Sequence, residues 1–236
     1  MLNTNIILNK NNKKSFFFKF KKKKENSNYL INYLQGWSGI ELFKIEIKKN
    51  NVFNFSDLSV YSKFKKFEYN LLLKNGSVIF QNKKKKINLK QNDLFTLQTT
   101  SDDISIKAKK KSNVFIVRTK IKNSQNKSKK YNFIKNIKPR NLWGGKCISR
   151  LLQTKNITIV MFNLKKNFQF YDKGHHNEQI TWLFKGKMKF FISKNSRILT
   201  SDHGVDIGKY ITHGGISSGA IGFDIFFPKR KEQKYK

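Results

Sequence analysis

The segment Asp172-Lys-Gly-His-His-Asn-Glu-Gln-Ile-Thr-Trp-Leu-Phe-Lys-Gly186 joins a polar turn to an apolar stretch that ends at a glycine. It holds two of the four histidines of the chain, His175 and His176, and the other two, His203 and His213, follow it. Any chemistry that depends on imidazole is therefore confined to the last third of the sequence.

On both sides of this segment, apolar residues recur with a period of two in short stretches separated by charged or Asn-rich turns. This alternation is typical of strands with one buried face. Many short strands at close spacing predict an all-β sandwich or barrel. The clearest examples are Val78 and Phe80, Ile104 and Ile106, Ile157 and Ile159, and Met188 and Phe190.

The two halves of the chain look like copies of each other. Placing Phe67–Gly76 on Asn177–Gly186 aligns both glutamates and both glycines at a constant offset, which also sets Asp103 opposite His213. A duplicated barrel explains the length and the rhythm of the sequence. We expect a basic extension (1–28) that is disordered rather than a transit peptide, an N-terminal barrel (29–121), a linker (122–141), a C-terminal barrel (142–231) and a basic tail (232–236).

The formal net charge of +36 would ordinarily point to nucleic acid. Only five of the 50 basic residues are Arg, however, and Arg is the side chain that reads guanine and clamps phosphates. The excess Lys comes with many Asn, Ile and Phe, whose codons are A/T-rich, so we attribute it to an AT-rich genome and do not expect nucleic acid as the ligand.

No apolar run is long enough for a membrane span, and Cys147 is the lone cysteine, so we expect a cytoplasmic protein without disulfides.

The residues around Gly186 resemble the first motif of the cupin superfamily, which are β-barrels of the jelly-roll type. That motif runs Gly, five residues, His-x-His, three or four residues, Glu, six residues, Gly. His175 matches its second His, Gln179 stands at the carboxylate position, and Gly186 follows after six residues. His213 matches the His that ends the second motif, and Phe223–Arg230 is similar to the closing strand of many cupins. The resemblance implies two tandem cupin barrels, and within the superfamily it is greatest to two-barrel isomerases of secondary metabolism.

Two departures from the motif bear on function. Lys173 stands where the first ligand His is expected, and the N-terminal half has Lys65, Tyr69 and Asp103 at the ligand positions and no His at all. We therefore expect at most one metal site.

The resemblance implies that His175, Gln179 and His213 converge in the barrel as ligands of one divalent transition metal (Fe, Co, Ni, Mn or Zn). His176 could fill the vacancy at 173 if the turn rotates it inward. Because these ligands are neutral, a small anionic substrate such as a keto acid would balance the charge of the ion.

Several nearby residues have two interpretations. Glu178 is a candidate acid–base group, or an exterior strand residue paired with Lys. Lys173 could bind a substrate carboxylate, or mark the loss of the site. His203 is expected in a loop, and Arg230, near the chain end, is expected to be a solvated surface residue rather than a substrate ligand.

Together these features predict a metal-dependent bicupin enzyme, an isomerase of a small keto acid. The alternatives are a cupin dioxygenase, which O₂ uptake with Fe(II) would reveal, and a binding cupin that has lost metal and turnover. A homodimer is left open.

Overall fold

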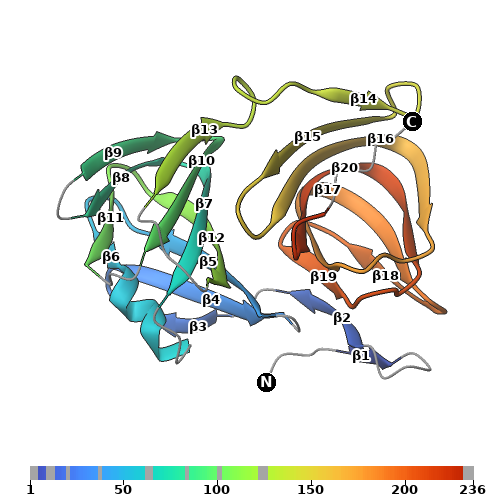
Figure 1. The fold of residues 1–236 in the computed structure, drawn as a ribbon, viewed down its shortest axis with the longest axis horizontal. Coiled ribbons are helices and arrows are strands. Elements are labelled where there is room, and N and C mark those ends of the chain that lie inside the picture. Colours follow the sequence, from blue (N-terminus) through green and yellow to red (C-terminus); the bar gives the residue numbers. More distant parts are fainter. Residues whose placement is uncertain are drawn as a thin grey trace. The chain divides into compact units, whose positions relative to one another are not determined.

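The computed structural model describes residues 5–8, 14–19, 22–36, 39–61, 66–82, 85–99, 103–121 and 127–230. These residues form two compact units, shown in Figure 1. The N-terminal unit comprises Lys21–Gln35 and Gly39–Asn136, and the C-terminal unit comprises Met1–Phe20, Gly36–Ser38 and Ile137–Lys236.

In the described part of the N-terminal unit, a seven-stranded and a four-stranded antiparallel sheet enclose an apolar core. A short 3₁₀ helix, η1 (Phe55–Tyr61), contributes Phe55 and Leu58 to that core. The larger sheet has the order β13 (Ser128–Asn132), β10 (Asp93–Thr99), β7 (Phe67–Asn75), β12 (Ser112–Lys120), β5 (Ile40–Ile47), β4 (Tyr29–Gln35) and β3 (Lys22–Glu25). The smaller sheet has the order β6 (Val52–Asn54), β11 (Ile104–Ala108), β8 (Ser77–Asn82) and β9 (Lys85–Lys90).

The C-terminal unit is built on three long strands of 15 residues each, β16 (Thr158–Asp172), β17 (Glu178–Ile192) and β20 (His213–Phe227). Irregularities in their pairing bend these strands, so that the sheet curls around an apolar interior (Figure 1). The described strands run β1 (Asn5–Leu8), β2 (Lys14–Lys19), β19 (His203–Ile207), β17, β20, β16, β15 (Cys147–Gln153) and β14 (Arg140–Leu142), and β18 (Asn195–Leu199) pairs with β17.

The internal repeat predicted from the sequence is confirmed by the strand order. In the N-terminal unit β7 lies between β10 and β12, and the first half of β17 lies in the same way between β19 and β20. Gly76 follows β7 and Gly186 divides β17, and both have positive φ, +90° and +84°. A side chain at either position would be strained and would also meet neighbouring backbone, which explains why glycine recurs at this offset.

The N-terminal extension, predicted to be disordered, contains strands among its described residues. Phe16, Phe17 and Phe18 of β2 are buried, and β2 pairs with β19 of the C-terminal unit. The backbone N–H of Gly208 also donates to Ser15 Oγ. In a corresponding way β13, within the predicted linker, pairs with β10 of the N-terminal unit. Burial of an aromatic cluster outweighs the lysine-rich composition that pointed to disorder.

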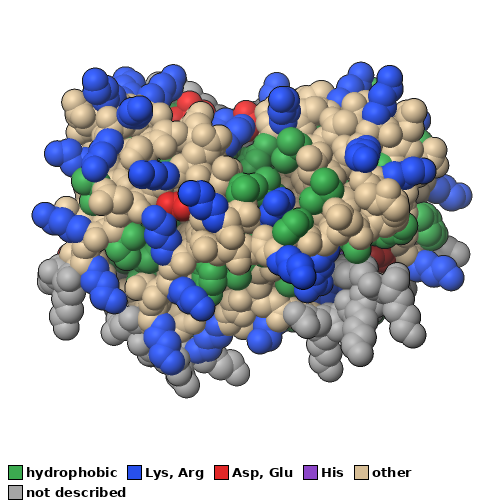
Figure 2. Space-filling view, turned by 90° about the horizontal axis from the view of Figure 1, so that it is seen from above, with side chains coloured by type: hydrophobic (Ala, Val, Ile, Leu, Met, Phe, Trp, Pro, Cys, Tyr) green, Lys and Arg blue, Asp and Glu red, His purple; other side chains and the backbone are tan. Residues whose placement is uncertain are grey.

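Basic side chains are scattered over the face drawn in Figure 2 and do not gather in a single patch. A nucleic-acid groove would concentrate them along one track. No helix in the described part of the chain is long and apolar enough to cross a membrane.

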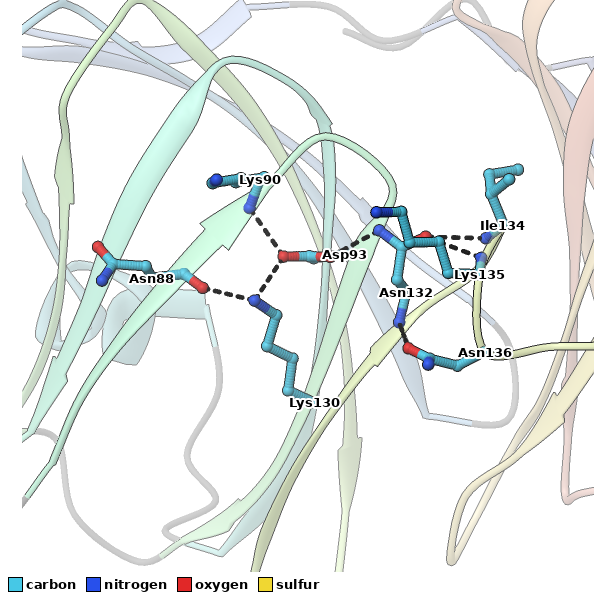
Figure 3. Close-up of polar contacts among 8 residues, drawn as sticks. All are labelled: Asn88, Lys90, Asp93, Lys130, Asn132, Ile134, Lys135 and Asn136. Atoms are coloured by element: carbon cyan, nitrogen blue, oxygen red, sulfur yellow. Dashed lines mark hydrogen bonds and ion pairs between the residues drawn. The ribbon is translucent and has the colours of Figure 1, made fainter.

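The pairing of β13 with β10 is reinforced by a polar cluster around Asp93 (Figure 3). Asp93 Oδ2 accepts from Lys130 Nζ at 2.8 Å and from the backbone N–H of Lys90 at 2.9 Å, and its Oδ1 accepts from Asn132 Nδ2 at 2.8 Å. Burial alone would raise the pKa of Asp93, but the hydrogen bonds from Lys130, Lys90 and Asn132 together hold this pKa below its ordinary value.

We expect Asp93→Asn to lower the free energy of unfolding by about 1–3 kcal/mol at pH 7, because it removes a buried charge that accepts three hydrogen bonds. A lowered pKa stabilises the folded state above the pKa of the unfolded chain, near about 3.9, and this contribution is lost as pH falls through the folded-state pKa. Urea unfolding between pH 7 and pH 3 measures both effects.

The control is Glu46→Gln, which removes a partly exposed ion pair with Lys44 and should change the free energy of unfolding by less than about 0.5 kcal/mol. An unchanged pH dependence in Asp93→Asn would contradict the assignment.

Candidate metal centre

The turn between β16 and β17 determines which of the two adjacent histidines faces the interior. Gly174, with φ +100°, packs so closely that a Cβ would lie 2.6 Å from the carbonyl carbon of Tyr210. The backbone N–H of Gly174 donates to Asp172 Oδ1, and that of Tyr210 donates to the His175 carbonyl. Fixed in this way, the turn directs His175 inward and leaves His176 exposed.

Asp172, His175 and His213 come together at this turn. One ligand atom of each lies within 4.8 Å of those of the other two, and the His175 and His213 rings are 5.5 Å apart and nearly perpendicular. Asp172 and His213 are direct neighbours across the β16–β20 pairing. The register of two long strands therefore places a carboxylate beside two imidazoles.

The hydrogen bonding of His213 suits it for metal binding. Its Nδ1 lies 2.9 Å from the Ile211 carbonyl oxygen, which can only accept, so Nδ1 carries the proton and Nε2 keeps its lone pair. Ligand histidines in metal sites are commonly oriented in this manner. Burial lowers the pKa of both His213 and His175, so both rings are neutral at pH 7, as coordination requires.

Gln179 connects His175 to a buried polar network. Gln179 Nε2 donates to Thr181 Oγ1 at 2.8 Å and to Asp224 Oδ1 at 3.0 Å, so its Oε1 points toward His175 Nε2, 2.9 Å away. Thr181 Oγ1 donates to the same Asp224 oxygen at 2.6 Å. A spacing near 2.9 Å fits a hydrogen bond, and it also fits two ligand atoms about 2.1 Å from one ion at a right angle. Burial raises the pKa of Asp224 to about 6.

Arg230 lies beside this centre, which corrects the prediction of a solvated surface role. Its side chain is 14% exposed, its Nη2 is 3.7 Å from Asp172 Oδ2, and its guanidinium lies over the Phe226 ring. The backbone of Arg230 is held by Thr158 Oγ1 and by Gln153 Nε2. These two bonds hold Arg230 beside the strand ends that carry Gln153 and Thr158.

The structure places the side chains of Gln179 and His213 next to that of His175; their role as metal ligands stays a prediction. Glu178 is buried, but it alternates with Gln179 along β17 and so faces the opposite side of the sheet. Lys173 and His176 are exposed. His203, expected in a loop, is the first residue of β19, and its Nδ1 lies 2.8 Å from Thr200 Oγ1.

Asp172, Asp224 and Arg230 were not singled out as parts of the centre. Asp172 directly precedes the unexpected Lys173, and the other two belong to the tail string that resembles the cupin closing strand. Their places next to Lys173 and within the closing-strand string are the only features of the sequence that pointed to these three residues.

In the N-terminal unit the corresponding positions do not form such a centre. Tyr69, the counterpart of Gln179, is 2% exposed and packs its ring against Phe55 and Phe67. Asp103 is exposed, and Lys65 lies outside the described residues. Among the described residues, the one cluster of potential metal ligands is that of Asp172, His175 and His213.

The chain was also compared with known proteins. No protein-family model matches it, and no curated protein sequence matches it. Among solved structures, AerE from Microcystis aeruginosa has a TM-score of 0.71 at 12% identity, over 90% of this chain and 98% of AerE. Oxalate decarboxylase from Bacillus subtilis has a TM-score of 0.71 at 8% identity, over 92% of this chain and 78% of its own.

A cupin 2 conserved barrel domain protein from Leptotrichia buccalis has a TM-score of 0.59 at 13% identity, over 87% of this chain and 91% of its own. At such low identities these likenesses concern the fold. The chain has the fold of two tandem cupin barrels, as predicted from the sequence motifs.

We expect Thr181→Val to destabilise the C-terminal unit by about 1–3 kcal/mol, because it removes a donor to Asp224 and an acceptor for Gln179 at a buried position. Chemical denaturation followed by circular dichroism measures the change. Thr200→Val, the same substitution at an exposed site, serves as the control and should cost less than about 0.5 kcal/mol. Equal stability of Thr181→Val and the native protein would show that the network contributes nothing.

Proposed function

We propose that this chain is a metal-dependent cupin enzyme that isomerises a small anionic substrate resembling a keto acid. The observation that carries the proposal is the convergence of His175, His213 and Asp172 in the interior of one barrel, with Arg230 beside them. The equivalent region of the other unit lacks histidine, which limits the proposed activity to the C-terminal unit.

The donors at this centre fit a divalent transition metal. His175 and His213 would supply imidazole nitrogens, and Asp172 and Gln179 would supply oxygens, a set suited to Fe, Co, Ni, Mn or Zn. A bound divalent cation would act as a Lewis acid on a substrate carbonyl.

Arg230 supports an anionic substrate. Its guanidinium is largely buried within reach of the Asp172 carboxylate, and Arg presents paired donors that match a carboxylate. We assign Arg230 the role of holding the acid group, in place of the exposed Lys173. The aromatic rings of Phe226 and Phe190, which contact His175 and His213, would exclude water from the reacting atoms.

The resemblance to the bicupin isomerase of bacilysin biosynthesis supports isomerisation. A second candidate, a dioxygenase, is favoured by the ligand set itself, because two histidines and one carboxylate on one side of an ion are the ligands of many non-haem Fe(II) oxygenases.

We expect purified protein to retain about one transition-metal ion per chain, and the His175→Ala/His213→Ala double variant to lose it, because the imidazoles provide the strongest donors of the site. Elemental analysis after reconstitution with Fe(II), Co(II), Ni(II), Mn(II) and Zn(II) measures the content. His203→Ala, a histidine outside the centre, should keep the native content. Failure of the native protein to hold any of these metals would overturn the metalloenzyme proposal.

For an isomerase, turnover of small keto acids by the metal-loaded protein should be the same under nitrogen and in air, because moving a proton between carbons consumes no oxidant. Product analysis by NMR, together with an oxygen electrode, makes the measurement. Stoichiometric O₂ uptake with Fe(II) would replace the isomerase with the dioxygenase.

A further inference from the structure

A cavity of about 120 Å³ opens inside the C-terminal unit. It is lined by side chains of β14, β15, β16, β17 and β20 and by Trp143, and most of these side chains are apolar. The lining apolar residues are Leu142, Trp143, Leu151, Val160, Phe162, Leu164, Phe168, Phe170 and Met188, and the polar or weakly polar ones are Arg140, Cys147, Ser149, Thr181 and Asp224.

The cavity adjoins the candidate metal centre along the inside of the barrel. Gln179 pairs with Phe226, and two residues further along the same strands Thr181 pairs with Asp224. Residues two apart in a strand face the same side. Thr181 and Asp224, which line the cavity, therefore lie one row beyond Gln179, the residue that contacts His175.

The two ends of the cavity differ in chemistry. At the end toward the centre, Asp224 Oδ1 already accepts from Thr181 and Gln179. Trp143 and Arg140 are exposed and mark the solvent side, with Trp143 56% exposed and its ring 5.1 Å from that of Phe168. Between these ends the cavity is lined by aliphatic and aromatic side chains.

The size of the cavity limits what it can hold. In another protein, an apolar cavity of about 150 Å³ stays dry and binds benzene. A cavity of about 120 Å³ is of the same order, and its lining by Phe162, Phe168 and Phe170 favours contact with an apolar group over water. A two-carbon acid at the centre would leave this space unfilled.

We propose that this cavity binds the apolar body of the substrate, an aryl, cycloalkyl or branched-alkyl group no larger than about six carbons. The substrate is then a small acid with its acid group at the histidine centre and its apolar group between Val160 and Phe168. The placement of the acid group rests on the proposed function. The binding of the apolar group does not, because the residues that line the cavity are not the candidate metal ligands.

The test compares the affinities of 3-phenylpropanoate and acetate for the metal-loaded protein by isothermal titration calorimetry. We expect 3-phenylpropanoate to bind about 10- to 100-fold more tightly, from burial of one ring. Equal affinities would overturn the proposal.

A cavity-filling variant locates the effect. Val160→Phe places a ring in the cavity and should abolish the advantage of 3-phenylpropanoate while leaving acetate binding unchanged. Ile198→Phe adds the same ring at an exposed position of β18 and should behave as the native protein. If Val160→Phe fails to fold, Trp143→Ala at the rim is used instead, with a several-fold loss expected for 3-phenylpropanoate alone. Loss of both ligands to the same extent would contradict the proposal.

A neutral probe separates this proposal from the proposed function. 3-Phenylpropanol carries the ring without the acid, and we expect it to bind metal-free protein and to be excluded by Val160→Phe. Binding of the alcohol together with failure to retain metal would leave the cavity site standing and overturn the metalloenzyme. Metal-dependent binding of acetate without any binding of the alcohol would overturn the cavity site alone.

Discussion

The candidate centre depends on the register of one strand, β20, between β16 and β17. This register sets Asp172 beside His213 at one end of the strand and Thr181 beside Asp224 near the other. A slip of one residue would turn every side chain of β20 to the opposite face. The local irregularities in both pairings let the strands curl while this alignment is kept. The arrangement of the functional groups is therefore a property of backbone pairing, and the side chains of the centre then add hydrogen bonds to an alignment already fixed.

The part of the centre that follows a periodic or spaced pattern could be predicted from sequence. His175, Gln179 and Gly186 follow the spacing of a known motif, and the period of two identified the strands that carry them. Arg230 ends the string that resembles the cupin closing strand, but that string does not show where its side chain lies. The bonds of its backbone to Gln153 and Thr158 place it beside the centre. Asp172 joins the histidines through cross-strand register, which no local spacing encodes. The alternation of side chains along β17 separates Glu178 from the centre.

The two copies of the barrel have filled their interiors in different ways. In the N-terminal unit the guanidinium of Arg118, 1% exposed, pairs with Glu41 at 2.6 Å and lies over the rings of Phe43 and Phe67. A buried charge of this kind is tolerated because its partner is fixed beside it. Tyr69 occupies the position of Gln179. In the N-terminal unit protein side chains thus occupy this part of the interior, whereas in the C-terminal unit a cavity lies one row beyond Gln179.

The docking of β2 on β19 has a consequence for the order of events during synthesis. Ser15 Oγ and the Gly208 amide, which it accepts from, are 193 residues apart in the chain. The aromatic cluster Phe16–Phe18 therefore emerges from the ribosome before its partner strand β19, and Phe17 stays unprotected until β19 has been translated. Meanwhile the intervening unit, Lys21–Gln35 with Gly39–Asn136, can close upon itself. The many lysines around Phe16–Phe18 give this waiting segment a strong positive charge, and mutual repulsion between nascent chains would keep it from aggregating in the interval.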